Sequence, residues 1–193
     1  MITKKYRSSF LIAVPFLAAS MVCWGAGGEI EAFAGGSTFD QGGGSHGTFG
    51  LTGGMKVTSA WSVFGEFSWE QLASESDSSS GVNVNASVNL ANLGGGVAYN
   101  FGPLSKKVFP YALVAGGVGH FYGSGSASGN GTSVSISMPL ANAGYLGAGG
   151  GTRIYLGKRW GIKPEIRVDR YVNSAFAGNT VTYTAGLFWE FGE

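Results

Sequence analysis

Charged and apolar residues alternate near the end of the chain, where Lys163, Glu165, Arg167 and Asp169 occupy every second position. A strand repeats every two residues, so this spacing places all four side chains on one face. Carboxylates beside basic groups can exchange protons, line an ion path or form buried ion pairs. Because an unpaired buried charge is very costly, we expect these side chains to pair if that face is enclosed.

Other residues with chemical potential are few. The chain has two histidines, His46 and His120, and Ser124 and Ser126 follow the second of them closely. They form no hydrolase motif, and the Gly-Ser run over 123–131 lacks the Gly-Lys-Ser/Thr of a phosphate loop. No Cys/His/Asp cluster has metal-ligand spacing. We therefore predict no catalytic residue, no metal and no cofactor.

The composition restricts the fold class. Glycine accounts for 35 of 193 residues, and only 12% of residues are charged. Glycine destabilises a helix interior by about 1 kcal/mol relative to alanine, which argues against a helical bundle. An apolar content of 44% argues against disorder. The net charge of +1 and the lack of a basic stripe argue against a nucleic-acid partner.

The first residues have the layout of a secretory signal peptide. Lys4, Lys5 and Arg7 precede an apolar run over 10–22, and small residues follow over 25–28. We predict a signal peptide over 1–26, with cleavage between 25 and 28, and one mature domain over 27–193. A buried helix and lipid attachment at Cys23 are the alternatives.

The mature chain has strand periodicity throughout. Stretches that alternate or are apolar cover 29–39, 48–58, 61–70, 89–101, 109–122, 141–156, 162–169 and 181–191. Residues 84–90 alternate in the opposite phase to 93–101, which indicates a bulge or a loop, and 109–122 is apolar on both faces. Without helices between them, eight strands predict an all-β, antiparallel up-and-down meander. Several match the 9–11 residues that cross a bilayer.

The connections alternate in length. We expect long loops at 40–46, 75–87, 123–140 and 173–179, and short turns at 58–60, 102–107 and 157–159. Long loops at one end and tight turns at the other are typical of outer-membrane barrels.

The two faces of these strands differ in bulk as well as polarity. An eight-stranded barrel has room only for side chains, so large apolar residues fit better outside, facing lipid. The lumen would then hold a charge network of Lys56, Glu66, Glu70, Arg153, Lys163, Glu165, Arg167, Asp169 and Glu190. Counted from the short turns, Glu66, Glu165 and Arg167 fall near mid-height. Balanced signs favour a plug over an ion path or catalytic carboxylates. A soluble barrel with the apolar face inside is the other reading.

Aromatic residues gather near the predicted strand ends, as in interfacial girdles. We assign Trp61, Phe109, Trp160, Trp189 and Phe191 to the short-turn end, together with Phe101, and Trp69, Phe121 and Tyr171 to the other end.

Three segments carry a resemblance to a known family. They are GAGGGTRIYL at 147–156, WGIKPEIR at 160–167 and TAGLFWEFG at 184–192. The chain from about residue 29 resembles the bacterial outer-membrane β-barrel domain family, related to small OmpA/OmpX-type barrels. This resemblance implies an eight-stranded transmembrane barrel in the outer membrane of a diderm bacterium, inserted by the barrel assembly machinery.

The function expected from these features is non-catalytic. We expect a structural, envelope-integrity or adhesin-like role, with outer-membrane lipid as a partner and a surface ligand at loops 75–87 and 123–140. A narrow pore or small-ligand-binding barrel is the alternative. A lipid-modifying barrel enzyme ranks below both.

Overall fold

The computed structural model describes residues 27–40, 45–79, 82–129, 132–172 and 177–192, and nearly all of them lie in strands. The predicted signal peptide lies outside these residues. In chain order the strands are β1 (Gly28–Phe39), β2 (Ser45–Lys56), β3 (Trp61–Ser79), β4 (Val82–Asn100), β5 (Val108–Gly129), β6 (Thr132–Tyr155), β7 (Trp160–Val172) and β8 (Ala177–Phe191). Among the described residues, no helix is long and apolar enough to cross a membrane.

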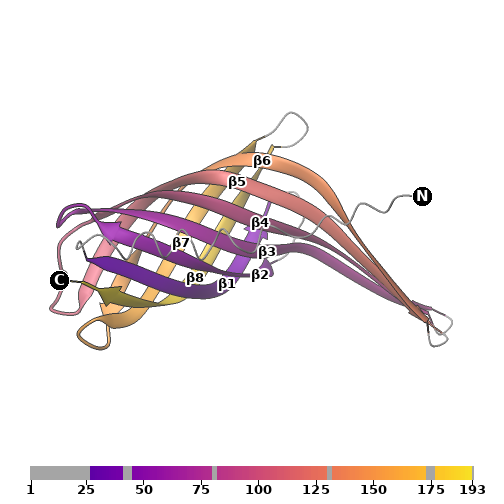
Figure 1. Cartoon of the computed structure of the whole chain (residues 1–193), viewed down its shortest axis with the longest axis horizontal. Coiled ribbons are helices and arrows are strands. Elements are labelled where there is room, and N and C mark those ends of the chain that lie inside the picture. The colour runs from indigo at the N-terminus through magenta and orange to yellow at the C-terminus, as the bar shows by residue number, and fades with distance from the viewer. Residues whose placement is uncertain (1–26, 41–44, 80–81, 130–131, 173–176, 193) are drawn as a thin grey trace.

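Each strand pairs antiparallel with its neighbours in sequence, and β8 closes the sheet by pairing with β1 (Figure 1). The closing register runs from Gly28 opposite Phe191 to Phe39 opposite Thr180. The prediction of an eight-stranded antiparallel meander is therefore confirmed, and the closed ring leaves no free edge along the barrel wall.

The alternation has its apolar face on the outside. On β7, Ile166 is 58% exposed and Val168 is 49% exposed, whereas Arg167 and Asp169 are buried. On β8, Leu187 and Trp189 are exposed and Phe188 is buried. A water-soluble barrel would reverse this arrangement. The outer surface is therefore suited to lipid, and the alternative of a soluble barrel is wrong.

Glycine makes room for bulky side chains inside the barrel. A Cβ atom at Gly94 would overlap the Tyr145 hydroxyl, and one at Gly117 would lie 2.9 Å from the Tyr145 ring. Phe121 and Tyr171 are buried in the interior beside Tyr145. Their assignment to a lipid-facing girdle is therefore wrong, because glycine-lined walls leave space for rings inside.

The short turns lie where the pattern predicts them. The backbone N–H groups of Val57, Leu104 and Leu156 donate to carbonyls across the turn, at 2.9 to 3.1 Å. At the opposite end, the outward-facing Arg170 donates to Asn179, which in turn donates to Asp40. This polar chain marks the end of the apolar belt on that side.

Two of the predicted long loops are instead strands. Residues 75–87 and 123–140 belong almost entirely to two hairpins, in which β3 pairs with β4 as far as Ser79 and Val82, and β5 pairs with β6 as far as Gly129 and Thr132. Pairing of β2 with β3 ends at Glu70, and pairing of β6 with β7 ends at Gly144. A four-stranded ribbon, hereafter the extension, thus runs beyond the barrel, toward the right in Figure 1. Its Ser, Gly and Asn residues have loop composition, but the backbone groups between the four strands pair with one another, which leaves only the outer edges of β3 and β6 without a neighbouring strand.

The opposite phase of 84–90 has a different origin from the one predicted. Strand β4 pairs with β5 without a register shift, so it has neither a loop nor a bulge there. Its apolar face changes sides: Leu93 and Val97 are exposed on the outside, whereas Leu90 is fully buried inside. The hydrophobic face therefore turns from the lipid side to the inner side as the strand leaves the apolar belt. The extra residues lie elsewhere, at Leu72 in β3 and Leu140 in β6.

We predict that depth decides the effect of a charge on the outer face. Ile166→Arg should lower the free energy of unfolding in phosphatidylcholine vesicles by about 2–4 kcal/mol, because it places a charge near mid-bilayer. Val172→Arg, at the end of the same strand, should cost about 1 kcal/mol or less. Denaturant unfolding followed by tryptophan fluorescence measures both values, and equal losses would contradict the placement of the belt.

Candidate functional site

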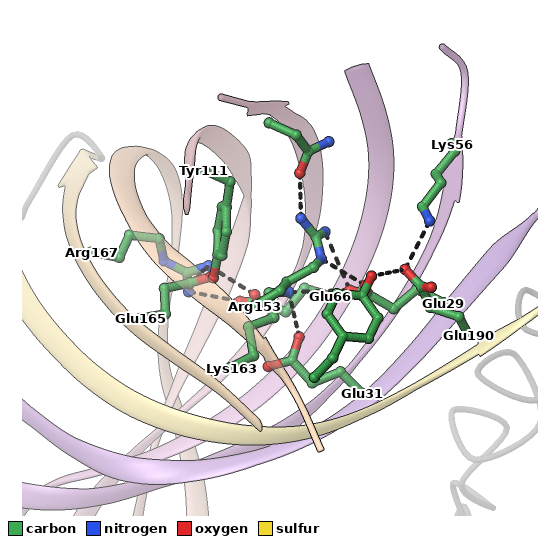
Figure 2. Close-up of polar contacts among 12 residues, drawn as sticks. Glu29, Glu31, Lys56, Glu66, Tyr111, Arg153, Lys163, Glu165, Arg167 and Glu190 are labelled. Atoms are coloured by element: carbon green, nitrogen blue, oxygen red, sulfur yellow. Dashed lines mark hydrogen bonds and ion pairs between the residues drawn. The ribbon is translucent and has the colours of Figure 1, made fainter. Parts of the chain in front are cut away.

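The polar interior of the barrel is the candidate functional site. Charged side chains from β1, β3, β6 and β7 point toward one another across the interior in Figure 2. Most are buried, so their charges depend on protein partners rather than on water.

Arg167 on β7 is the centre of the first group. Its Nη1 and Nη2 atoms donate to the two carboxylate oxygens of Glu66 on β3, at 2.8 and 2.7 Å. Its Nε donates to Asp169 at 3.0 Å, and Nη1 lies 4.0 Å from Glu165. A planar guanidinium suits this bidentate geometry, which lysine cannot reproduce. The group joins two strands that are not neighbours in the sheet.

Lys163 and Arg153 form a second group with two glutamates of β1. The Lys163 ammonium lies 2.6 Å from Glu31 and 3.4 Å from Glu29. Arg153 Nε donates to Glu29 at 2.8 Å, and the same guanidinium donates to Asn100. The sequence reasoning did not identify Glu29 and Glu31 as luminal. The alternation of the sequence could have identified them, because Glu29 and Glu31 flank the apolar Ile30. In the structure the Ile30 side chain is half exposed on the outer face.

Tyr111 lies between the two groups. Its hydroxyl donates to Glu165 at 2.6 Å, while its ring centroid lies 4.9 Å from the Arg153 guanidinium and 5.2 Å from the Lys163 ammonium. Both faces of β5 are apolar in sequence, so the pattern left this residue unassigned. The odd-numbered residues of β5 face inward, beginning with Phe109 and Tyr111.

The remaining predicted charges differ in their surroundings. Lys56 pairs with Glu190 at 2.8 Å near the short-turn rim, where the Lys56 side chain is half exposed. Tyr155 also donates to Glu190, at 2.7 Å. Glu70 is fully buried but has no ion pair among the described residues, and Asn92 donates to it at 3.0 Å. Pairing of every luminal charge was expected, so Glu70 is the exception.

An apolar layer lies on the side of the charges nearest the extension. It is formed by Phe39, Leu72, Leu90, Phe121, Ala143, Tyr145 and Tyr171. The two cavities that border the charged groups measure about 30 and 10 Å³. The larger has room for one or two water molecules and the smaller for at most one. Paired charges and packed rings therefore fill the described part of the lumen.

The proposed girdle residues divide between the two faces. Trp61 packs on the Tyr99 ring at 5.0 Å, and Trp160 lies opposite Trp189 in the register of β7 and β8. Phe191 shares the outer face of β8 with Trp189. Trp69 packs on Phe49 at the other end of the belt. The interfacial role of these residues stays a prediction.

The assignment of Phe109 to the girdle is wrong. It lies on the luminal side, where its ring packs 5.3 Å from Tyr155, and Tyr155 in turn packs on the buried Phe188. The alternation of β5 decides this orientation, because Tyr111 and Leu113 on the same face are buried.

Among the described residues, neither histidine forms an ion pair with the luminal charges. His120 is exposed on β5, where its Nδ1 lies 2.6 Å from the Asn142 amide oxygen and its ring stacks on Tyr122. His46 lies at the start of β2, opposite Ser37. Within the described ranges, no group of three or more His, Cys, Asp or Glu side chains could hold a metal ion.

We predict that the buried and rim ion pairs differ in their contribution to stability. Arg167→Ala leaves Glu66 and Asp169 without their counter-charge and should lower the free energy of unfolding by about 3–5 kcal/mol. Lys56→Ala removes a partner that is half exposed and should cost about 1 kcal/mol or less. Denaturant titration in vesicles compares them. A small loss for Arg167→Ala would show that water solvates the lumen.

A double-mutant cycle separates the pair from general damage. Glu66→Ala with Arg167→Ala should cost less than the sum of the single changes, because once Arg167 is absent, removing Glu66 takes away a carboxylate that has already lost its counter-charge. Additive losses would contradict direct coupling of the two side chains.

Comparisons with known proteins place this geometry in context. No family model and no curated protein matches the chain. Among solved structures, it is similar to the attachment invasion locus protein Ail of Yersinia pestis, with 16% identity over 86% of this chain and 99% of that one, at a TM-score of 0.52. Neisserial surface protein A matches with 13% identity over 87% and 98% of the two chains, at a TM-score of 0.58.

Two further solved structures are similar to the chain. A major outer membrane protein of Thermus thermophilus matches with 13% identity over 85% of this chain and 99% of that one, at a TM-score of 0.55. Ail was also solved with the heparin analogue sucrose octasulfate. These likenesses span nearly the whole of each solved chain. The protein therefore has the fold of the small OmpA/OmpX-type outer-membrane β-barrels.

Proposed function

We propose that the protein is a non-catalytic outer-membrane barrel that anchors a surface-contact element, the extension, to the envelope of a diderm bacterium. The observation that carries this proposal is the pairing of a filled lumen with strands much longer than a membrane needs. β5 and β6 have 22 and 24 residues, against about 9–11 for a crossing. About half of each is therefore available outside the bilayer.

The orientation follows from the two ends of the barrel. The short turns carry Lys106, Lys107, Lys158 and Arg159, which suit the anionic phospholipids of the inner leaflet. The extension then projects outward from the cell. Export by the signal peptide over 1–26, cleaved between 25 and 28, and insertion by the barrel assembly machinery belong to this proposal.

The filled lumen argues against the narrow pore. A hydrated ion needs a continuous water-filled path, whereas the two cavities beside the charges have room for only one or two waters and for at most one, respectively. The cross-lumen pairs also neutralise the groups that would otherwise attract an ion. Envelope integrity and surface contact fit these features better than transport does.

We predict that the protein in planar bilayers gives at most small, rare conductance events. Paired charges and the apolar layer both block the lumen, so no steady current should flow. Steady large conductance in the unmodified protein would favour the pore.

Topology and contact are tested on intact cells. Ser128→Cys, in the extension, should react with a membrane-impermeant maleimide, whereas Ser105→Cys, in a short turn, should not. Replacing 74–87 and 123–139 by short turns should leave the barrel heat-modifiable on gels but reduce attachment of the bacteria to host cells or to one another. Labelling at position 105 alone would invert the topology, and unchanged attachment would remove the contact role.

A further inference from the structure

One face of the extension carries hydroxyl and amide side chains in a regular array. The strand registers align Ser74, Ser87, Ser124 and Ser137 in one row across four strands. The next row is Ser76, Asn85, Ser126 and Ser135, and the third is Ser78, Asn83, Ser128 and Ser133. Adjacent strands lie about 4.8 Å apart and successive rows about 6.7 Å apart. All twelve positions on this face are therefore Ser or Asn.

The first two rows line a groove of about 770 Å³. Gln71 lines its end nearest the barrel. This volume falls within the range of about 300–1,000 Å³ that is usual for small-ligand sites. It is far larger than either cavity in the lumen.

The opposite face of the extension shows that solubility alone does not explain this array. There Val84, Val134 and Met138 are all about half exposed or more, and Asp77 pairs opposite Val84 on the same face. A ribbon selected only for contact with water would not collect its hydroxyl and amide side chains on one face. The hydroxyl groups are instead concentrated on the face that is hollowed.

Aromatic rings border the barrel end of the groove. Trp69 Nε1 donates to the Tyr122 hydroxyl at 2.5 Å, and the His120 ring stacks on Tyr122 with centroids 6.1 Å apart. Next to them Asn89 is buried, and its Nδ2 donates to Ser87 at 3.1 Å and to Ser124 at 3.3 Å. The Ser87 and Ser124 hydroxyls also bond to each other at 2.6 Å. The aromatic residues and the first serine row are thus held in defined positions.

The lack of basic residues near the groove distinguishes between anionic and uncharged ligands. Residues 73–88 and 123–140 contain no Lys, Arg or His, and their only charged residues are Glu75 and Asp77. A sulfated or phosphorylated ligand would need basic partners. Neutral hydroxyls and amides beside aromatic rings suit a ligand that offers many hydroxyl groups and an apolar C–H face.

We propose that this groove binds an uncharged glycan, with Trp69 and Tyr122 packing on a sugar ring and the serine and asparagine rows bonding to its hydroxyls. The inference deepens the proposed surface-contact function and rests on it. The glycan belongs to a neighbouring surface or to lipopolysaccharide of the same membrane. Both sources offer the same chemistry.

The test uses the mature chain refolded in phosphatidylcholine nanodiscs. The probes are an array of uncharged and sulfated oligosaccharides, together with lipopolysaccharide with and without an uncharged O-polysaccharide. We expect uncharged glycans to bind, and Ser126→Val/Ser135→Val to weaken that binding at least tenfold. Val84→Thr/Val134→Thr, on the opposite face, is the matched control and should bind as the unmodified protein does.

Two readouts keep the result interpretable. Glycan addition should change tryptophan emission in the unmodified protein but not in Trp69→Phe. Ser126→Ala/Ser135→Ala, which adds no bulk, should also weaken binding if the valine variant fails to fold. Array binding identifies a glycan of another surface as the source, whereas binding only to lipopolysaccharide with O-polysaccharide identifies the same membrane.

The overturning results are equally defined. Absence of binding to every uncharged glycan, preference for sulfated glycans, or equal binding by the groove and control variants would each refute the proposal. If such a result came with labelling at position 128 but not 105, and with weaker attachment after 74–87 and 123–139 are replaced, the surface-contact function would stand and only the glycan site would be refuted.

Discussion

The ion pair between Arg167 and Glu66 spans the lumen and joins two walls of the barrel that share no backbone hydrogen bonds. The contacts of Arg153 with Glu29 and of Lys163 with Glu31 do the same for other non-adjacent strands. Backbone pairing closes the ring, but it leaves the interior to be filled by side chains. Because the outer surface must be apolar to face lipid, the charged faces of β1, β3, β6 and β7 are turned inward, where their charges depend on one another.

Glycine residues in the barrel wall leave the space that the luminal side chains occupy. A Cβ atom at Gly147 would overlap the Asp169 carboxylate, and one at Gly186 would overlap that of Glu31. The Tyr145 side chain likewise occupies space that Gly94 and Gly117 leave open. Glycine at these positions is therefore a packing requirement of a narrow barrel with large luminal side chains rather than a sign of loops.

A filled lumen shifts attention to the part of the molecule beyond the belt. There the faces reverse their character: apolar residues move to the inner side, and hydroxyl groups take the outer side that faces lipid lower down. Trp69 and Tyr122 lie where the barrel meets the extension, and the Trp69 indole donates a hydrogen bond to the Tyr122 hydroxyl. The same strands thus serve as membrane anchor and as exposed surface, with an aromatic pair between them.

Alternation alone determined the strand count, the antiparallel meander and the inward face of β7, because Ile166 and Arg167 differ strongly in polarity. It did not determine the inward face of β5, where both faces are apolar, so Tyr111 and Phe109 were unassigned or misplaced. Nor did it reveal that Glu29 and Glu31 are the partners of Lys163, since partners across a lumen depend on strand number and stagger. Residues 75–87 and 123–140 have loop composition, and only pairing between neighbouring strands makes them a sheet. Local periodicity reports which residues share a face; the closed ring decides which faces meet.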